Sequence, residues 1–104
     1  MEKVNLKEFI SRAGDKPAVT TLYVNDCIRV KAIALKKGTE LPEHKTAVRT
    51  FLTVITGKIR FILSDETIEL EEGDWFNIPI QRRHSVEALT DAVFTLTQNL
   101  KDHG

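Results

Sequence analysis

The first hydrophobic pattern along the chain has the period of a helix. Asn5 is a favourable N-cap residue, and Glu8 stands three residues later, in the reciprocal position of a capping box. Gly14 follows as a C-terminal stop signal. Between them, apolar residues recur at spacings of three and four, at Leu6, Phe9, Ile10 and Ala13. This pattern predicts one short helix over residues 5–13.

After Gly14 the hydrophobic pattern changes to the short apolar and alternating runs of β-strands. About eight such runs occur, separated by turn-forming residues. They are residues 18–24, 27–35, 50–56, 58–63, 67–70, 75–79, 84–89 and 92–100. Many short strands at regular spacing are typical of an antiparallel sandwich or barrel. We therefore expect an all-β protein whose sheet region covers residues 17–100.

One of these strands is apolar on both of its faces. Strand side chains alternate, so Leu52 and Val54 point to one side while Phe51 and Ile55 point to the other. Both faces of such a strand are buried, one against the barrel interior and the other against a helix or a second subunit. We expect a homodimer to supply the outer cover, with cover by the N-terminal helix alone as the open alternative.

Composition and charge narrow the partners. The 104 residues fit a single domain spanning residues 1–104. Lys plus Arg and Asp plus Glu number 15 each, so no overall field favours nucleic acid or an anionic membrane, and we expect neither as a partner. Cys27 is the single cysteine, which excludes an intramolecular disulfide and a Cys-rich zinc site.

The two ends of the chain carry little chemistry. The N-terminus alternates charged and apolar residues and lacks the apolar core of a signal peptide. No window of the sequence approaches the length of a membrane-spanning helix. We therefore expect a cytoplasmic protein. His103 stands in the last four residues, where we expect a solvated tail.

Two glycine-to-histidine segments carry the candidate chemistry. In the first, five residues separate Gly38 from His44, and Gly57 closes the segment. In the second, residues 73–88, a glycine is followed by Pro79 and then by His84. Both segments, in this order and separated by a strand pair, resemble the two signatures of the cupin superfamily. The resemblance implies an antiparallel jelly-roll β-barrel with a short N-terminal helix, in which the two histidines converge on one point of the interior.

The resemblance also implies where metal ligands would lie. Metal-binding cupins use two histidines and a glutamate from the first signature and one histidine from the second. This chain has His44 and His84 at the first and last of these positions, but Thr46 and Thr50 at the other two. It also has Gln81 at a position that is usually glycine in the second signature.

Two missing ligands weaken the case for a metal. Zinc and iron sites normally need three or four N, S or carboxylate ligands, and a threonine hydroxyl is a poor substitute. We therefore expect no tightly held cofactor, although His44 and His84 could bind a divalent transition metal such as Zn, Ni, Fe, Mn or Cu. Glu40 or Glu43, expected on a loop, could supply a third ligand. The alternative for both histidines is a structural one, as polar interior residues hydrogen-bonded to threonine or backbone groups.

Three functions fit these observations. The first is a small barrel that binds a small organic or anionic molecule in its interior without a tightly held metal. Its ligand-binding residues would be His44, Thr46, Thr50, Leu52 and His84, with Val54, Val86 and Phe94 as further walls. The second is an enzyme and the third an assembly scaffold with a filled interior. The sequence does not identify a ligand, a reaction or a pathway.

Two kinds of enzyme are considered under the second function. One is a metal-dependent cupin enzyme, an oxygenase or isomerase-like, which uses His44 and His84 with a non-standard third ligand. The other resembles sugar epimerases of the same superfamily, which use a histidine base beside a carboxylate and a tyrosine. Asp74 and Asp91 are expected in turns, so neither is a convincing carboxylate partner.

Overall fold

A computed structural model describes residues 3–101 of the chain. One short helix precedes nine strands, and His103 lies outside the described residues. The elements are η1 (Leu6–Arg12), β1 (Ala18–Val24), β2 (Ile28–Leu35), β3 (Glu40–His44), β4 (Thr50–Thr56), β5 (Lys58–Leu63), β6 (Thr67–Glu71), β7 (Trp75–Ile78), β8 (His84–Ala88) and β9 (Ala92–Asn99). This part of the chain contains no helix of the length and hydropathy that crossing a membrane requires.

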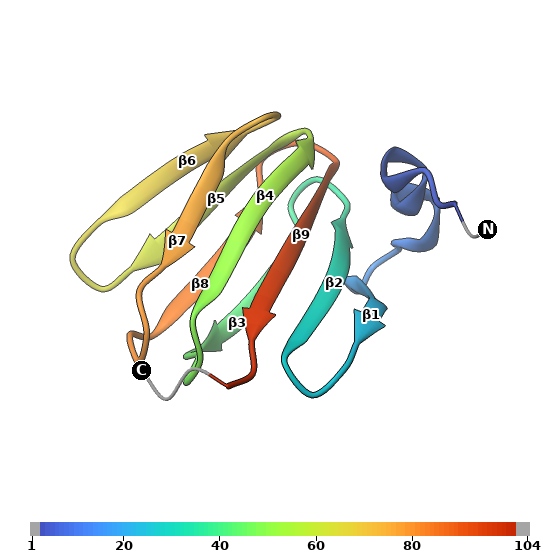
Figure 1. Cartoon of the computed structure of the whole chain (residues 1–104). Coiled ribbons are helices and arrows are strands. Elements are labelled where there is room, and N and C mark those ends of the chain that lie inside the picture. The colour runs from blue at the N-terminus through green and yellow to red at the C-terminus, as the bar shows by residue number, and fades with distance from the viewer. Residues whose placement is uncertain (1–2, 102–104) are drawn as a thin grey trace.

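The strands form two sheets that face each other (Figure 1). The front sheet has the order β1-β2-β9-β4-β7, and the sheet behind it has the order β3-β8-β5-β6. All strand pairs within the sheets are antiparallel. The two sheets are not joined into one closed ladder, so the jelly roll is a two-layer sandwich. This arrangement confirms the predicted all-β, antiparallel jelly-roll fold.

The predicted strands are present, and the structure adds β3, which the sequence analysis treated as a loop. Its five residues, Glu40–His44, comprise three polar residues, Pro42 and a single aliphatic residue, Leu41. Neither alternation nor β-propensity marks such a segment as a strand. Pairing with β8 holds it in place, with a register irregularity between Leu41 and His44. Glu40 and Glu43 therefore lie on a strand, which corrects the expected loop.

The core fills the space between the sheets. On β4, Leu52 and Val54 point inward and are fully buried. Phe61 of β5 and Phe94 of β9 are buried with them, as expected for alternating strands that each send one set of side chains inward. The other main members of this core are Ile33, Leu35, Ile59, Leu63, Leu70, Ile78, Val86, Ala88 and Ala92.

The N-terminal helix covers part of the outer face of the front sheet. It is a single stretch of 3-10 helix whose N-cap, Asn5, accepts a hydrogen bond from the backbone N–H of Lys7 through its side chain. Phe9 and Ala13 are buried in a second apolar cluster that reaches Ile55 of β4. The short N-terminal helix is thus confirmed, in 3-10 form.

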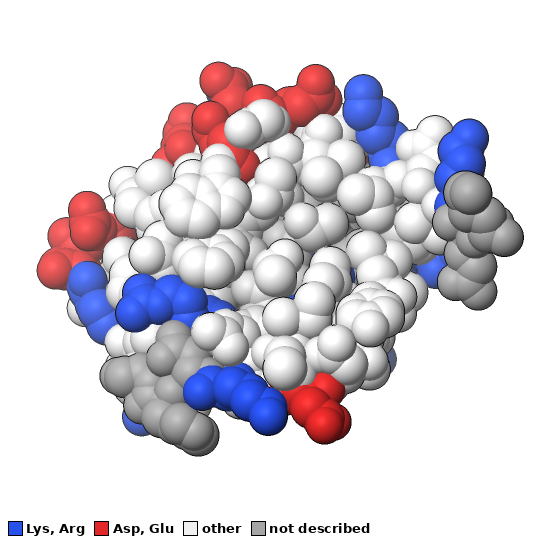
Figure 2. All heavy atoms as spheres, viewed as in Figure 1, with Lys and Arg blue, Asp and Glu red and all other residues white. Residues whose placement is uncertain are grey.

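The outer face of β4 is only half covered. Phe51, Thr53 and Ile55 are each half-buried, and of the three only Ile55 packs into the cluster beneath the helix. Figure 2 shows this face of the molecule as a broad uncharged area beside the helix. Within the described chain, the helix alone does not provide the second cover that the sequence pattern predicts.

Candidate functional site

A cavity of about 260 Å³ opens between the two sheets at one end of the jelly roll. Its walls are apolar and come from both sheets, including Ile33, Leu52, Phe61, Val86 and Phe94. Its polar end carries four residues singled out from the sequence: His44, Thr46, Thr50 and His84. Val54, expected as a wall, belongs to the buried core and not to the cavity lining.

His44 and His84 meet at this end of the cavity. β3 pairs with β8, and the two histidines are direct cross-strand partners although 40 positions separate them in the chain. Their ring centroids lie 4.4 Å apart at an interplanar angle of 64°. His84 is buried and stacks on Phe61 at 4.7 Å, whereas His44 is exposed at the mouth. The structure therefore brings together the two residues that the sequence analysis expected to converge.

Backbone carbonyls fix the orientation of both rings. Nδ1 of His44 lies 3.1 Å from the carbonyl oxygen of Pro42, and Nδ1 of His84 lies 3.1 Å from that of Arg82. A neutral imidazole in this position donates its Nδ1–H, so its Nε2 keeps a lone pair. The pair therefore offers two Nε2 acceptors to whatever enters the cavity.

Burial shapes the protonation of His84. Desolvation is the largest influence and lowers the pKa of His84 below its usual 6.5, because the charged ring loses its hydration. The hydrogen bond to the Arg82 carbonyl opposes this shift, and the neighbouring His44 adds to it. Burial therefore favours the neutral form of His84.

The segment before His84 is held by contacts to neighbouring loops. Arg82 forms an ion pair with Asp65, and Arg83 forms one with Glu43 on β3. The backbone N–H of Gln81 donates to the carbonyl of Thr46 at 2.8 Å. Gln81 has a φ of 64°, in the left-handed region that favours glycine. The turn thus keeps the backbone shape expected of a glycine at this position, although the residue is glutamine.

The two threonines satisfy one another. Their hydroxyl oxygens lie 3.2 Å apart, and each also lies within hydrogen-bonding distance of the Val48 carbonyl, at 3.2 Å for Thr46 and 3.0 Å for Thr50. The two hydroxyl groups have only two protons between them, so at most two of these three contacts are hydrogen bonds at one time. The threonines therefore form a small polar cluster beside the histidines and keep oxygen lone pairs free to accept from a ligand.

This donor set does not fit a resident transition metal. Among residues 3–101, no group of three His, Cys, Asp or Glu side chains is placed to share one ion. Glu43 pairs with Arg83 and does not line the cavity. Two imidazoles and hydroxyls already bonded to a carbonyl fall short of the three protein ligands that tight sites use. The described residues at this site are therefore too few to hold such an ion tightly.

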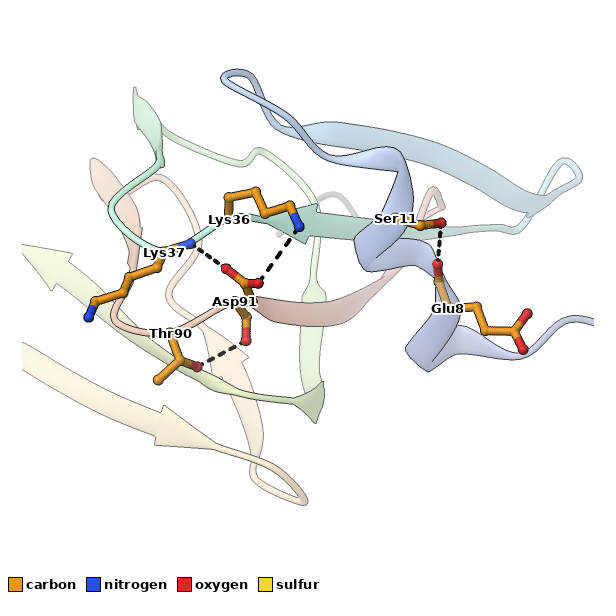
Figure 3. Close-up of polar contacts among 6 residues, drawn as sticks. All are labelled: Glu8, Ser11, Lys36, Lys37, Thr90 and Asp91. Carbon is orange, nitrogen blue, oxygen red and sulfur yellow. Dashed lines mark hydrogen bonds and ion pairs between the residues drawn. The ribbon is translucent and has the colours of Figure 1, made fainter.

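Among the described residues, no Asp or Glu lines the cavity beside the histidines. Asp91 lies at the opposite end of the jelly roll, where it accepts a hydrogen bond from the Lys37 backbone N–H and pairs with the Lys36 ammonium (Figure 3). Asp74 accepts from the Glu71 backbone N–H in the β6–β7 turn. Neither residue lines the cavity. The expectation that both belong to turns is confirmed.

Three polar residues of the cavity were missed from the sequence. Lys31 on β2, Lys45 after β3 and Gln98 on β9 all line it. Lys31 and Gln98 did carry a signal, because each has the same parity as the inward-facing residues of its strand, such as Ile33 and Phe94. A polar residue on the buried face of a strand indicates a cavity or a partner.

The family comparison agrees with the fold. A family model described as Cupin domain matches residues 32–97, which include the second half of β2, all of β3 to β8 and most of β9. That span holds both histidines and both threonines. Among functionally curated proteins, none matches the sequence.

Solved structures with the same architecture come from several bacteria. An RmlC-like cupin protein from Desulfovibrio desulfuricans superposes with a TM-score of 0.84 at 23% identity, covering 96% of this chain and 97% of that one. A cupin superfamily protein from Desulfitobacterium hafniense gives a TM-score of 0.85 at 14% identity, covering 96% and 92%. A protein with a double-stranded β-helix domain from Klebsiella pneumoniae gives 0.83 at 15% identity, covering 100% and 94%. At these identities the similarity shows the fold alone.

Proposed function

Because this chain belongs to the cupin family, we propose that it is a small binding module that holds a small organic or anionic molecule inside its jelly roll. The observation that carries the proposal is the cavity itself, which has apolar walls and a cluster of polar groups at one end. Binding sites for small molecules usually combine such walls with a few polar groups that fix orientation. A purely structural scaffold would instead fill this space with apolar side chains.

The residues have separable roles in this proposal. Leu52, with the other apolar walls, contacts the body of the molecule and excludes water. The Nε2 atoms of His44 and His84 accept hydrogen bonds from it, since their Nδ1 atoms are engaged with carbonyls. Thr46 and Thr50 add hydroxyl oxygens at the same end. The volume of about 260 Å³ suits a molecule smaller than a typical drug.

We propose that binding proceeds without a tightly held metal. The cupin family includes metal-binding members, but the donors that this chain places at the cavity are too few for tight binding. Added Zn²⁺ or Ni²⁺ should bind the histidine pair weakly and exchange freely.

A second candidate is a metal-dependent cupin enzyme, an oxygenase or isomerase-like, using His44 and His84 with a third ligand of unusual type. One observation favours it. Both Nδ1 atoms are bonded to carbonyls, which is how proteins commonly orient histidines whose Nε2 binds a metal. Elemental analysis of tag-free protein separates the two candidates, because a stoichiometric ion lost in both His44→Ala and His84→Ala would favour the enzyme.

Ligand binding is tested by a heat-stability screen with small acids, small neutral amides and sugars. We expect at least one compound to raise the melting temperature of the wild type, and both His44→Ala and His84→Ala to abolish the increase. Thr53→Ala is the control, since Thr53 lies on β4 but on its outer face. A compound that stabilises all four proteins equally would count against binding in the cavity.

A further inference from the structure

The charge around the cavity is one-sided. Lys31 and Lys45 line it together with both histidines, while none of the described residues that line it is acidic. The whole chain has equal numbers of acidic and basic residues, so this imbalance is local and does not follow from composition. A concave site lined by one sign of charge raises the local concentration of ions of the other sign.

The two lysines of the cavity lack internal counter-charges. Within residues 3–101, no ion pair is formed by Lys31 or Lys45, whereas Arg60, Arg82 and Arg83 each pair with a carboxylate. Lys31 is half-buried and projects from the inner face of β2, opposite Leu96 of β9. A lysine on the inner face of a sheet, without an acidic partner, is costly unless a ligand supplies the charge.

Gln98 adds a second, independent signal. Gln98 lines the cavity, and its Oε1 is buried and has no hydrogen-bond partner among the described residues. Buried polar side-chain atoms are nearly always paired, and leaving one unpaired is unfavourable. A hydroxyl would satisfy Gln98 whichever way its amide is turned, because a hydroxyl both donates and accepts. Gln98 is also the cross-strand neighbour of Thr50, so this group lies at the polar end.

From these groups we propose that the ligand is a small hydroxy acid with an apolar chain. Its carboxylate faces Lys31 and Lys45, its hydroxyl meets Gln98 and the histidine pair, and its chain contacts Leu52, with the other apolar walls. This inference rests on the function proposed above and names the chemical class of its ligand. Such a molecule meets the three requirements of the cavity at once, because it has a negative charge, a hydroxyl and an apolar body.

Three matched probes separate these requirements. They are 2-hydroxy-4-methylpentanoate, 4-methylpentanoate, which lacks the hydroxyl, and 2-hydroxy-4-methylpentanamide, which lacks the charge. Calorimetric titration of the full chain at low salt should rank the hydroxy acid first, the plain acid about fivefold weaker and the amide at least tenfold weaker. Low salt matters because screening weakens the contribution of partly exposed lysines.

Variants assign each requirement to a residue. Lys31→Met should weaken both acids about tenfold and leave the amide unchanged. Gln98→Met should remove most of the fivefold preference for the hydroxyl. Lys58→Met is the control, since Lys58 lies at the opposite end of the jelly roll and should leave all three affinities unchanged. Circular dichroism at 25 °C checks that each variant remains folded.

The possible failures are distinguishable. If the amide binds as tightly as the hydroxy acid, with loss in His44→Ala and His84→Ala, the anionic class is wrong and interior binding stands. If the acids bind but Lys31→Met leaves them unchanged, the placement of the charge is wrong. If no compound of the wider screen stabilises the protein, the proposed function falls together with this inference.

A different surface carries a second inference. On the outer face of the front sheet, Phe51 and Trp75 stack with ring centroids 5.1 Å apart and an interplanar angle of 26°. The Trp75 side chain is 59% exposed, and Tyr23 of β1 is 55% exposed. Two large exposed aromatic groups beside an uncharged sheet face are typical of an interface.

Charge is distributed unequally between the two ends of this face. The exposed acidic residues Glu71, Glu72 and Asp74 lie at the end of β6 and in the turn that leads to Trp75 of β7. At the opposite end of β4, Arg49 lies beside Asn99, whose backbone N–H donates to its carbonyl, and Lys101 follows. Figure 2 shows mainly acidic side chains at the upper left of the uncharged area and mainly basic side chains at its lower left, with an acidic group also at the lower edge.

We infer that a second copy of this chain covers this face, with its strands running in the opposite direction. A two-fold axis across the strands would place the acidic end of each copy against the basic end of the other and the Phe51–Trp75 stack near the centre. A two-fold interface must be complementary to itself, and an apolar centre between a mainly acidic end and a mainly basic end fits that condition. This proposal gives the homodimer expected from the sequence a specific interface, the outer face of the front sheet.

Light scattering combined with size-exclusion chromatography tests the dimer. At about 100 µM we expect twice the mass of one chain, and Trp75→Lys should reduce it to one chain without unfolding the protein. Val24→Lys is the matched control, because Val24 is also an exposed apolar residue, 51% exposed, but has the opposite parity to Tyr23 on β1. A single-chain mass for the wild type, or a dimer that survives Trp75→Lys, would overturn the inference.

Discussion

The two ends of the jelly roll are built by the same two sheets but differ in the side chains that point inward. At the closed end, Leu35 pairs with Ala92 and Ile59 pairs with Ala88, and all four side chains are buried. At the open end, the same sheets place His44 beside His84 and Gln98 beside Thr50. Each inner face thus changes from apolar to polar within about five residues, which is less than 20 Å of strand.

This difference separates stability from function. The closed end contributes hydrophobic burial, and at its rim Asp91 contacts Lys36 and Lys37 (Figure 3). The open end gives up some of that burial and keeps a cavity lined by polar groups. Substitutions at the closed end should therefore change the free energy of unfolding, and those at the open end should mainly change binding.

The largest expected effect is at the closed end. Gly57 has a φ of 84°, and a Cβ there would lie 2.7 Å from the Ala92 Cα, with the Asp91 carbonyl also in its way. Gly57→Ala combines left-handed strain with overpacking, so we expect about 2–4 kcal/mol of destabilisation. Chemical denaturation measures it.

Gly73→Ala is the matched control for this prediction. Gly73 has a similar φ of 91°, but nothing lies within 4 Å of the position of its Cβ. Only the backbone strain remains, so the cost should be about 1 kcal/mol. Equal costs for the two substitutions would show that the closed end is not tightly packed.

A smaller effect is expected from removing one hydroxyl at the open end. Thr50 is buried and its hydroxyl donates to the Val48 carbonyl, so Thr50→Val should cost about 1 kcal/mol of stability and also weaken ligand binding. Thr53→Val makes the same chemical change on the outer face of the same strand and should stay within about 0.5 kcal/mol of wild type. Identical results for both would remove the distinction between the two faces of β4.

The open end should also respond to acid. Because burial lowers the pKa of His84, this side chain binds a proton more readily in the unfolded chain than in the folded protein. The corresponding stability is therefore fully present above pH 6.5 and is lost as pH falls through the lowered pKa of the folded state. Denaturation curves between pH 7.5 and 5 should show this loss for the wild type and a flatter dependence for His84→Gln. A His84→Gln curve as steep as the wild type would assign the acid response to other groups.

The smallest expected effect is a gain. Gln81 holds a left-handed φ of 64° in an exposed turn before His84. Gln81→Gly removes that strain, although it also frees the unfolded chain, so we expect the protein to become more stable by about 0.5 kcal/mol. Thermal melts can resolve the difference, and a loss of stability would indicate that the Gln81 side chain contributes a contact of its own.

The fold was predictable because its signals are local and repeated. Alternation along each strand identified eight of the strands, and glycine spacing placed the turns, including Gly57, whose positive φ the structure confirms. β3 was not predicted, because its local propensity does not favour a strand. Residues Glu40–His44 become one through a long-range contact, the pairing with β8.

The site was predictable only in part. The convergence of His44 and His84 followed from signature spacing, which specifies neighbouring strands. The lysines and Gln98 could not be ranked as cavity residues before the sheet register was known, because register decides which strand positions meet at the open end. The proposed outer cover of β4 is a second copy of the chain, and a single sequence does not reveal which surface of that copy would meet it.

The most direct test of the account is a map of where a hydroxy acid binds. Amide chemical shifts of ¹⁵N-labelled protein should be followed as 2-hydroxy-4-methylpentanoate is added. We predict the largest changes at the open end, at Lys31, Thr50, His84 and Gln98, and none beyond noise at Gly57 or Asp91 of the closed end. Changes confined to the closed end or to the outer face of the front sheet would contradict the claim that the molecule is held inside the jelly roll.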